Sequence, residues 1–318
     1  MPVEIRPFRR GDREQLTALV NAHAAAVVPG LAVSVNAVMS QLEGEPGEFI
    51  VDPWVTERAT LVAEQRGRVV AAAHLLRYAD EERVGGSYRG AGEVRWCVFW
   101  PDAPFWPDAS EAAASLLDAC VRLLERWGVS RQYADGSLPA PAVYGVPEQW
   151  PHVRSAYERA GFLHSGRVEI VLLAEVGALL SQARAPLPGL AVRRTVGVNG
   201  TRLSAVLGGE VAGFVEVEEQ LEPGRLPRRH GLADVGNLEV AAGHRAKGLE
   251  DWLLAQAADW LGLTGVDRVL AYARPGDGDG DCDGEGAFFA GHPAFRELTR
   301  TLRGWERRPA VGGATRER

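Results

Sequence analysis

Val62 to Arg77 reads VAEQRGRVVAAAHLLR, and Ser204 to Glu219 reads SAVLGGEVAGFVEVEE. The two stretches align without gaps at an offset of 142 residues, and each has two runs around a glycine, Gly67 or Gly209. Two apolar or β-branched runs on either side of a glycine-bearing turn predict a β-hairpin. Because the hairpin recurs, the sequence contains an internal repeat and predicts two copies of one fold.

The repeat continues on the carboxyl side of both hairpins. The same offset aligns EVRWCVF, from Glu93 to Phe99, with VGNLEVA, from Val235 to Ala241. A helical pattern of apolar residues follows each of these strands. We expect the two helices to begin near Ser110 and Gly248.

The spacing changes after these helices. The next strands begin near Gly128 and Gly265, at an offset of 137 instead of 142. The first half is therefore expected to carry five extra residues between its central strand and its helix. Each half reads as strand, helices, hairpin, strand, helix, strand, helix and strands. This order predicts an α/β fold, with a mixed, mostly antiparallel sheet flanked by helices in each half.

The length agrees with two domains. A chain of 318 residues is long enough for two domains of about 150 residues each. The stretch 181–190, SQARAPLPGL, has the prolines and glycine of a linker. We therefore predict domains at 1–180 and 191–309, followed by a tail at 310–318.

Composition excludes several classes of protein. Hydrophobic residues make up 46% and charged residues 24% of the chain, as in ordinary globular proteins. The net charge of −7 argues against a nucleic-acid partner. The opening MPVEIRPFRRGDRE has no apolar core, and no run approaches the ~20 apolar residues of a membrane span. We expect a cytoplasmic protein without a membrane partner, whose widely spaced Cys97, Cys120 and Cys282 form neither a disulfide framework nor a metal site.

The junction between the second central strand and its helix has the composition of an anion site. It reads LEVAAGHRAKGLEDWLL, from Leu238 to Leu254. A strand that turns directly into a helix leaves backbone N–H groups unpaired at the positive end of the helix dipole, where a diphosphate can bind. Gly248 lets the backbone approach a ligand, and Arg245 and Lys247 supply positive charge.

Glu250 leaves two interpretations of this junction open. An acidic residue in the first turn of a helix gains about 0.3–1 kcal/mol from the dipole without any ligand. Beside a bound diphosphate it would repel by about 1–4 kcal/mol at ~4 Å. The junction is either a functional diphosphate-binding site or an inherited site that no longer binds its ligand.

The first half has a poorer version of the same junction. At an offset of 137, Arg245 corresponds to Asp108 and Gly248 to Glu111, so acids replace the cation and the glycine. We expect weak binding of a diphosphate there. The nearby aromatic residues either line a substrate pocket or pack in the core. They are Trp96, Trp100, Phe105 and Trp106.

These motifs resemble the GNAT superfamily of N-acetyltransferases in its tandem form. LEVAAGHRAKGLEDWLL is similar to the acyl-CoA pattern of that family, and SAYERAGF, from Ser155 to Phe162, is similar to its late helix and strand. The opening VEIRPFRRGDREQLTALV resembles its first strand and helix. The resemblance covers most of residues 3–308. It implies two GNAT-like domains, with acetyl-CoA as the acyl donor.

The resemblance also implies roles for individual residues. A backbone N–H of the central strand, at Val240 or at Val98, would serve the thioester oxygen. With the junction, the implied cofactor-binding residues are Val240, Arg245, Ala246, Lys247, Gly248, Leu249 and Glu250. A carboxylate on the same strand would remove a proton, and the candidates are Glu93, Asp234 and Glu239.

The resemblance further implies that a tyrosine on the late helix protonates the leaving thiolate. Tyr157 matches this position in the first half. The second half has Ala290 at the corresponding position, and His292 or Tyr272 could substitute.

One acidic stretch matches a calcium-binding loop only in part. The stretch 276–286, GDGDGDCDGEG, has alternating aspartates, but the residue at the twelfth position is Ala290 where the motif requires glutamate. We interpret the stretch as a flexible acidic loop and predict no metal site.

Two functions of different class remain. The first is an N-acetyltransferase that acts on the amine of a small molecule or peptide. The second is a ligand-binding or dimerising module whose acyl-CoA site has been lost. Gly248 and Arg245 favour the enzyme, whereas Glu250 and the missing second tyrosine favour the module. The sequence is also compatible with a homodimer.

Overall fold

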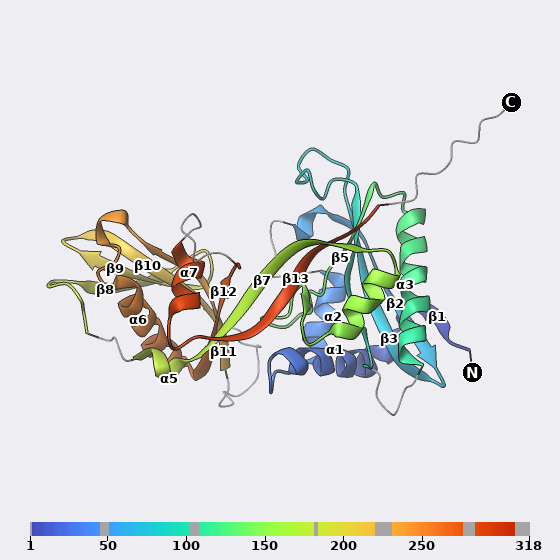
Figure 1. Cartoon of the computed structure of the whole chain (residues 1–318), viewed down its shortest axis with the longest axis horizontal. Helices are drawn as coiled ribbons and strands as arrows, with labels where there is room; N and C mark the ends of the chain where they lie inside the picture. Colours follow the sequence, from blue (N-terminus) through green and yellow to red (C-terminus); the bar gives the residue numbers. More distant parts are fainter. Residues whose placement is uncertain are drawn as a thin grey trace. The chain divides into compact units, whose positions relative to one another are not determined.

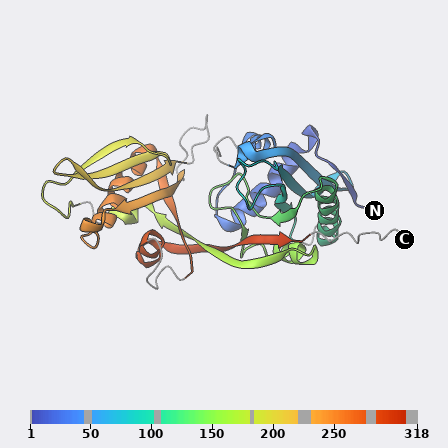
Figure 2. The same ribbon diagram turned by 90° about the horizontal axis from the view of Figure 1, so that it is seen from above.

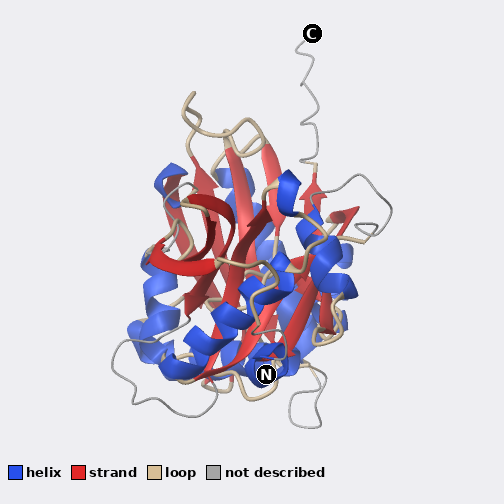
Figure 3. Cartoon of the chain, turned by 90° about the vertical axis from the view of Figure 1, so that its left-hand side faces the viewer, coloured by secondary structure: helices blue, strands red, loops and turns tan. Residues whose placement is uncertain are grey.

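The computed structural model describes residues 2–44, 51–101, 108–180, 184–219, 231–275 and 284–308. The chain divides into two compact units. Unit 1 comprises the residues up to Arg167 and those from Thr301 on, and unit 2 comprises Val168–Arg300. Both are α/β units in which helices flank a mostly antiparallel sheet, so the predicted fold class is confirmed (Figure 1 and Figure 3).

Unit 1 contains the first helices and the first hairpin. Its sheet order is β1-β2-β3-β4-β5-β13-β7, with β6 beside β13. β4 and β5 are parallel. Its elements are β1 (Glu4–Pro7), η1 (Arg10–Asp12), α1 (Arg13–Val27), α2 (Val35–Glu43), η2 (Asp52–Trp54), β2 (Val55–Gln65), β3 (Arg68–Tyr78), β4 (Ala91–Phe99), α3 (Ala109–Arg126), β5 (Arg131–Ala134), β6 (Val146–Pro147), α4 (Pro151–Arg159) and parts of β7 (Leu163–Glu175) and β13 (Arg296–Arg307).

Unit 2 repeats this sheet. Its order is β8-β9-β10-β11-β12-β7-β13, and β11 and β12 are parallel. Its elements are the remainder of β7, α5 (Val176–Leu179), β8 (Ala191–Val196), β9 (Thr201–Leu207), β10 (Glu210–Glu219), β11 (Gly231–Val240), η4 (Ala242–His244), α6 (Leu249–Thr264), β12 (Val266–Ala273), α7 (Gly284–Gly291) and the remainder of β13.

The core of unit 1 explains why β3 is an almost unbroken apolar run. α1 and α3 both pack on β3. Val69–Leu76 of β3 is accordingly buried along its whole length. A strand covered on both faces has no solvent-facing positions, so apolar residues do not alternate with polar ones.

Two long strands each contribute to both units. Residues 163–167 of β7 and 301–307 of β13 belong to unit 1, whereas 168–175 and 296–300 belong to unit 2. β7 and β13 lie side by side (Figure 1 and Figure 2). The late part of β7 pairs with β12, and the late part of β13 pairs with β5.

The units therefore differ from the predicted domains at 1–180 and 191–309. Residues 168–180 lie in unit 2, and 301–307 return to unit 1, because the last strands of each sheet come from both halves of the chain. Of the predicted linker, 181–183 lies outside the described residues, as does the tail at 310–318. Leu187 and Leu190 pack against the core of unit 2.

The second half lacks the helices that we expected between its first strand and its hairpin. β8 passes to β9 through residues 197–200 alone, where the Gly197 N–H donates to the Gly200 carbonyl at 2.8 Å. Gly200 has φ +85°, and a Cβ there would lie 2.4 Å from the Val217 carbonyl oxygen. This tight turn leaves no chain for counterparts of α1 and α2.

The extra residues of the first half are spread over the connection before the helix, the helix itself and the turn after it, and do not all precede the helix. The connection from β4 to α3 comprises 100–108, and that from β11 to α6 comprises 241–248, so the two differ by one residue. α3 has 18 residues and α6 has 16. The counterpart of Gly248 at the helix N-cap is therefore Asp108, not Glu111 as the sequence offset suggested.

We predict that Trp305, near the end of the chain, stabilises unit 1. Trp305 is 1% exposed, pairs with Ala134 of β5 and contacts the Tyr157 ring. Trp305→Ala should lower the free energy of unfolding by about 3–5 kcal/mol. Hydrogen exchange should then increase in β4 and β5, whereas Leu263→Ala, at a residue 77% exposed, should change little. Increased exchange confined to β8–β12 would contradict the assignment.

Candidate functional site

In each unit the two parallel central strands pair briefly and then separate. β4 pairs with β5 over Ala91–Val94, and β11 pairs with β12 over Gly231–Asp234. A β-bulge interrupts the neighbouring antiparallel pairing at the same place, between His74 and Leu75 in unit 1 and between Glu216 and Val217 in unit 2. Bulges bend a strand and end its pairing. In unit 1 the Ser137 N–H still donates to the Arg95 carbonyl at 3.2 Å. Beyond these contacts the described residues give each central strand no further strand pairing on this side, and we call this side of the strand the opening.

The direction of the backbone N–H groups shows which ones face the opening. The Trp100 N–H donates to Val70 on β3 at 3.3 Å. Because N–H directions alternate along a strand, the Val98 N–H also points to β3, and not into the opening as its predicted role requires. In unit 2, the Ala241 N–H donates to Ala212 on β10 at 2.9 Å, so the Val240 N–H points into the opening.

The start of α6 presents free backbone donors. Gly248 is the N-cap residue, has φ +79° and offers no side-chain cap to the first turn. Ala246 is also left-handed, with φ +57°. The first N–H groups of a helix have no partner inside the helix, and here no capping side chain accepts from them. Leu249 is buried, so its side chain leaves the approach to these donors clear.

Two cations stand on the same connection. The Arg245 Nε donates to the Val240 carbonyl at 3.3 Å, and the Lys247 Nζ donates to the Gly243 carbonyl at 2.6 Å. Both residues are exposed and bonded to neutral carbonyls. Their charges are therefore available to an anion at the helix N-terminus.

Two acids share the first turn of α6. Glu250 is half-buried. The Asp251 carboxylate lies 3.3 Å from the His292 Nε2. The His292 Nδ1 accepts from the Ala294 N–H at 3.2 Å, so the proton of a neutral ring would be on Nε2, the atom that faces Asp251. His292, one of the two substitutes considered for a catalytic tyrosine, therefore lies beside the helix start.

Unit 1 lacks such a start at its corresponding helix. Asp108 stands where unit 2 has Gly248, and the Gln65 amide donates to its carboxylate at 3.3 Å. Phe105 and Trp106 lie outside the described residues. Of the remaining aromatic cluster, Trp100 is half-buried, and Trp96 is fully buried and donates to Gln41 at 2.9 Å.

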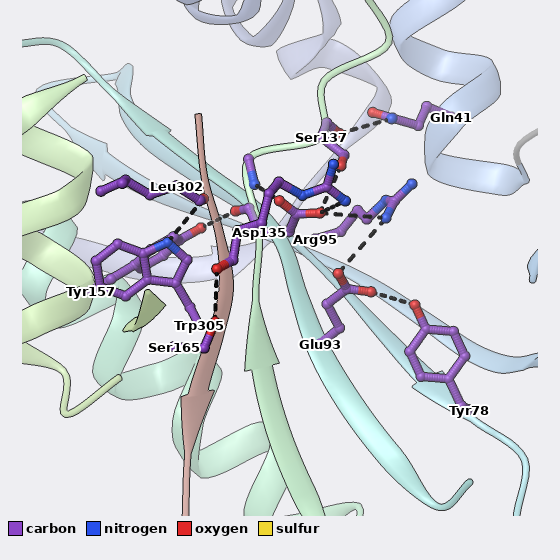
Figure 4. A network of polar contacts seen from close by, with 12 residues as sticks. Gln41, Tyr78, Glu93, Arg95, Asp135, Ser137, Tyr157, Ser165, Leu302 and Trp305 are labelled. Carbon is purple, nitrogen blue, oxygen red and sulfur yellow. Dashed lines mark hydrogen bonds and ion pairs between the residues drawn. The ribbon is translucent and has the colours of Figure 1, made fainter. Parts of the chain in front are cut away.

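Glu93 and Asp234 occupy equivalent positions. Glu93 precedes Val94, and Asp234 precedes Val235. These two valines are the last paired residues before the bulge in each central strand. Glu93 is 4% exposed, accepts a hydrogen bond from the Tyr78 hydroxyl and lies 3.7 Å from Arg95 (Figure 4). Burial and the Glu93 charge raise the pKa of Tyr78 well above its usual value. Asp234 is half-buried and accepts from the Tyr272 hydroxyl.

Asp135 extends the polar network of unit 1 and was not predicted. Its carboxylate accepts from the Gly136 N–H at 2.8 Å and from the Ser137 hydroxyl at 2.9 Å. It also lies 4.0 Å from Arg95 (Figure 4). Arg303 lies 3.6 Å from the same carboxylate. Arg303 comes from β13, so no local sequence pattern could have joined it to Asp135.

The remaining predicted residues are less favourably placed. Tyr157 is fully buried and donates to the Asp135 carbonyl at 2.6 Å, and burial raises the pKa of its hydroxyl well above the usual value. Glu239 is exposed on β11, opposite Phe214 on β10. In the described residues, no three histidine, cysteine or acidic side chains form a cluster that could hold a metal. The acidic stretch 276–283 lies outside them.

Unit 1 also holds a pair of histidines that the sequence did not reveal. The Nε2 atoms of His23 on α1 and His152 on α4 are 3.0 Å apart. The His23 Nδ1 donates to the Leu19 carbonyl at 2.9 Å, so its Nε2 accepts from His152. Burial lowers the pKa of His23 to about 3. Burial, followed by the charges of Arg58 and Arg95, lowers that of His74 to about 3 as well.

Comparisons with known proteins identify the fold. No family model and no curated protein matches the sequence. A tandem GNAT protein from the clavulanic acid biosynthesis pathway matches the structure with a TM-score of 0.62 and 15% identity, over 97% of this chain and 100% of that one. A GCN5-related N-acetyltransferase from Sphaerobacter thermophilus matches with a TM-score of 0.57 and 14% identity, over 97% of each chain.

A third solved structure is a GCN5-related glucosamine N-acetyltransferase region of a fungal multi-domain β-N-acetylglucosaminidase. It matches with a TM-score of 0.57 and 11% identity, over 96% of this chain and 38% of that one. No helix in the described ranges is long and apolar enough to cross a membrane. The resemblance seen in the sequence is confirmed at the level of the fold: the chain has the fold of tandem GNAT proteins.

The buried histidines predict a loss of stability in acid. In the unfolded chain a histidine has a pKa near 6.5, whereas His23 and His74 have values of about 3 in the folded protein. The unfolded state therefore binds more protons as the pH falls below 6.5, and the free energy of unfolding should fall by about 2 kcal/mol per histidine between pH 7 and pH 5.

Urea unfolding of the His74→Gln variant tests this. The variant should show a pH dependence weaker by about one histidine's contribution than that of the unaltered chain. An unchanged slope between pH 7 and pH 5 would show that His74 is not held neutral.

Proposed function

We propose that the chain is an acyl-CoA-dependent N-acyltransferase that binds its donor in unit 2, where β11 passes into α6. The observation that carries the proposal is the left-handed Gly248 at the N-cap of α6, with uncapped donors behind it and Arg245 and Lys247 beside it. This combination suits the diphosphate of coenzyme A. The tandem GNAT fold supports it, because solved proteins of that fold are described as N-acetyltransferases.

The residues present fit acetyl-CoA. A Cβ at Gly248 would meet one atom within 4 Å, from Pro186 at 3.8 Å, so the backbone is open to a ligand. When bound, acetyl-CoA supplies a reactive thioester. The amides of the first turn of α6, with Arg245 and Lys247, would hold its diphosphate. The Val240 N–H, directed into the opening, would donate to the thioester oxygen as charge develops there.

Proton transfer is assigned to Asp234 and Tyr272. Asp234 stands at the mouth of the opening, where β11 and β12 separate. Its carboxylate would accept a proton from the attacking amine. The Tyr272 hydroxyl, which donates to Asp234, orients that carboxylate and is the nearest candidate acid for the leaving thiolate. Glu239, exposed further along the same strand, is the alternative base.

The acceptor is proposed to be an amine of a small molecule or peptide. In unit 2, β8 passes directly to β9, so no helices comparable to α1 and α2 would restrict the size of the acceptor there. The nearby carboxylates Asp234 and Glu239 favour a positively charged acceptor.

A non-catalytic binding module is the alternative. The observation that favours it is that the candidate site groups of unit 1 are either replaced or already hydrogen-bonded within the protein. Asp108 replaces glycine at the helix start, and the Tyr157 hydroxyl is bonded to the backbone. Unit 1 would then serve as a scaffold, and the alternative holds if unit 2 does not bind the donor.

Acetyl-CoA binding should stabilise the protein. At about 100 times its Kd, the ligand should raise the free energy of unfolding by about 2.7 kcal/mol. The double variant Arg245→Ala/Lys247→Ala should bind at least tenfold more weakly in calorimetry, because two charge-assisted contacts are lost. Glu250→Gln should bind about fivefold more tightly, since a like charge of about 1 kcal/mol is removed.

Asp108→Ala is the matched control in unit 1 and should leave the affinity unchanged. Loss of binding in this control, with retention in the double variant, would move the donor to unit 1. No stabilisation at millimolar acetyl-CoA would favour the binding module.

Asp234→Asn should reduce the rate of acetyl transfer more than it changes donor binding. General-base catalysis contributes about 10²–10⁴-fold. With the best acceptor from a panel of polyamines, aminoglycosides and peptides, thiol release should therefore slow by at least 100-fold at an unchanged Kd for acetyl-CoA. Glu93→Gln, at the equivalent position of unit 1, is the control. A large loss in Glu93→Gln with a normal rate in Asp234→Asn would reverse the assignment.

A further inference from the structure

A large cavity within unit 1 has no role in the proposed reaction. It measures about 1040 Å³ and lies at the outer edge of the sheet, beside β1 and β2. In the sheet order, β3 separates it from the central strand β4. We name it the edge groove. Its lining includes three arginines and three apolar residues of α2: Arg10, Arg58, Arg126, Val35, Met39 and Leu42.

The floor of the edge groove is an unpaired strand edge. β2 begins at Val55, but β1 pairs only with Leu61–Glu64. The last bond between them is from the Phe8 N–H to the Thr60 carbonyl at 2.9 Å. Because backbone directions alternate, the N–H and carbonyl of Arg58, two residues away, also point outward. β1 has left the sheet by then, so these groups can pair with an added strand.

α2 supplies one wall of the groove. Val35, Met39 and Leu42 follow the spacing of one helix face, line the groove and are half-buried. Val38 belongs to the same face, on its core side, and is fully buried. The apolar face of α2 therefore extends from the core at Val38 to the open strand edge at Met39.

α3 supplies the opposite wall. The Thr60 side chain contacts His74, which stacks on Trp96, and Trp96 donates to Gln41 of α2. Thr60 and Arg58 therefore face α2. The alternate residues of β2 face α3, whose last turn adds Leu123 to the groove lining.

The rim is basic although the chain carries a net charge of −7. Four arginines and two glutamates line the groove. Arg13 is bonded to Glu14 at 3.1 Å and Arg58 to Asp52. Arg10 and Arg126 are exposed, and neither has an ion pair with any residue of the described ranges.

We propose that the edge groove binds an extended acidic peptide as an added strand on β2. Strand addition satisfies the outward N–H and carbonyl of Arg58. Successive side chains of a strand point to opposite faces, so apolar residues of the peptide would meet the apolar face of α2 and intervening carboxylates would meet Arg126. The proposal is independent of the acyltransferase reaction, since it uses no residue of unit 2.

Fluorescence anisotropy with the full chain tests the proposal. The probe is a labelled octapeptide of alternating leucine and glutamate, and its counterpart has lysine in place of glutamate. The acidic peptide should bind saturably and the basic one should not. Arg126→Glu should weaken binding at least tenfold, whereas Arg122→Glu, one turn earlier on α3 and outside the groove lining, should change it less than twofold.

Backbone methylation separates strand addition from simple charge attraction. Two further acidic peptides carry N-methyl groups, one on every leucine and the other on every glutamate. Only one set of N–H groups faces β2 in an added strand, so one peptide should lose at least tenfold in affinity and the other should bind nearly normally. Equal behaviour of the two, equal losses in Arg126→Glu and Arg122→Glu, or no binding of the acidic peptide would each overturn the proposal. Saturable binding of dodecanoate without any peptide binding would assign the groove to a fatty acid and overturn it too.

Discussion

The separation of two parallel strands is the constraint around which both units are built. β4 and β5, like β11 and β12, are joined over about four residues and then part beside a bulge. The parting leaves backbone donors of the central strand without a neighbouring strand. It also places one carboxylate, Glu93 or Asp234, at the mouth of each opening. The topology of each unit therefore already supplies the three parts of the proposed site: N–H donors, a carboxylate and the start of a helix.

The two units use this geometry differently because of a few side chains. In unit 1 the carboxylates are enclosed by Tyr78 and arginines, and an acid occupies the helix N-cap. In unit 2 the N-cap is Gly248, and the neighbouring cations are exposed. The Asp108 carboxylate would repel an anion at the start of α3, whereas the acids in the first turn of α6 are accompanied by Arg245 and Lys247. These side chains are the reason why we propose the diphosphate site in unit 2 and not in unit 1.

Local signals in the sequence predicted local structure well. Gly67, Gly209 and Gly248 mark turns and a helix start because their backbone conformations favour glycine, and such positions can be read from short windows. The candidate carboxylates were found because they flank the central strands. Pairings between distant segments could not be predicted in this way. The pairing of β13 with β5, the bond from Tyr78 to Glu93 and the direction of the Val98 N–H depend on register and bulges, which periodicity does not encode. The missing helices of unit 2 were predicted by analogy with the first half, and the short turn at 197–200 excludes them.

Titration of the ¹⁵N-labelled protein with acetyl-CoA, followed by NMR, tests the central claim most directly. If the donor binds where β11 meets α6, the largest shifts should occur at the amides of Val240, Leu249 and Glu250, with the amides of unit 1 nearly unchanged. Shifts confined to Phe99 and the start of α3, or no shifts at saturating concentrations, would contradict the account.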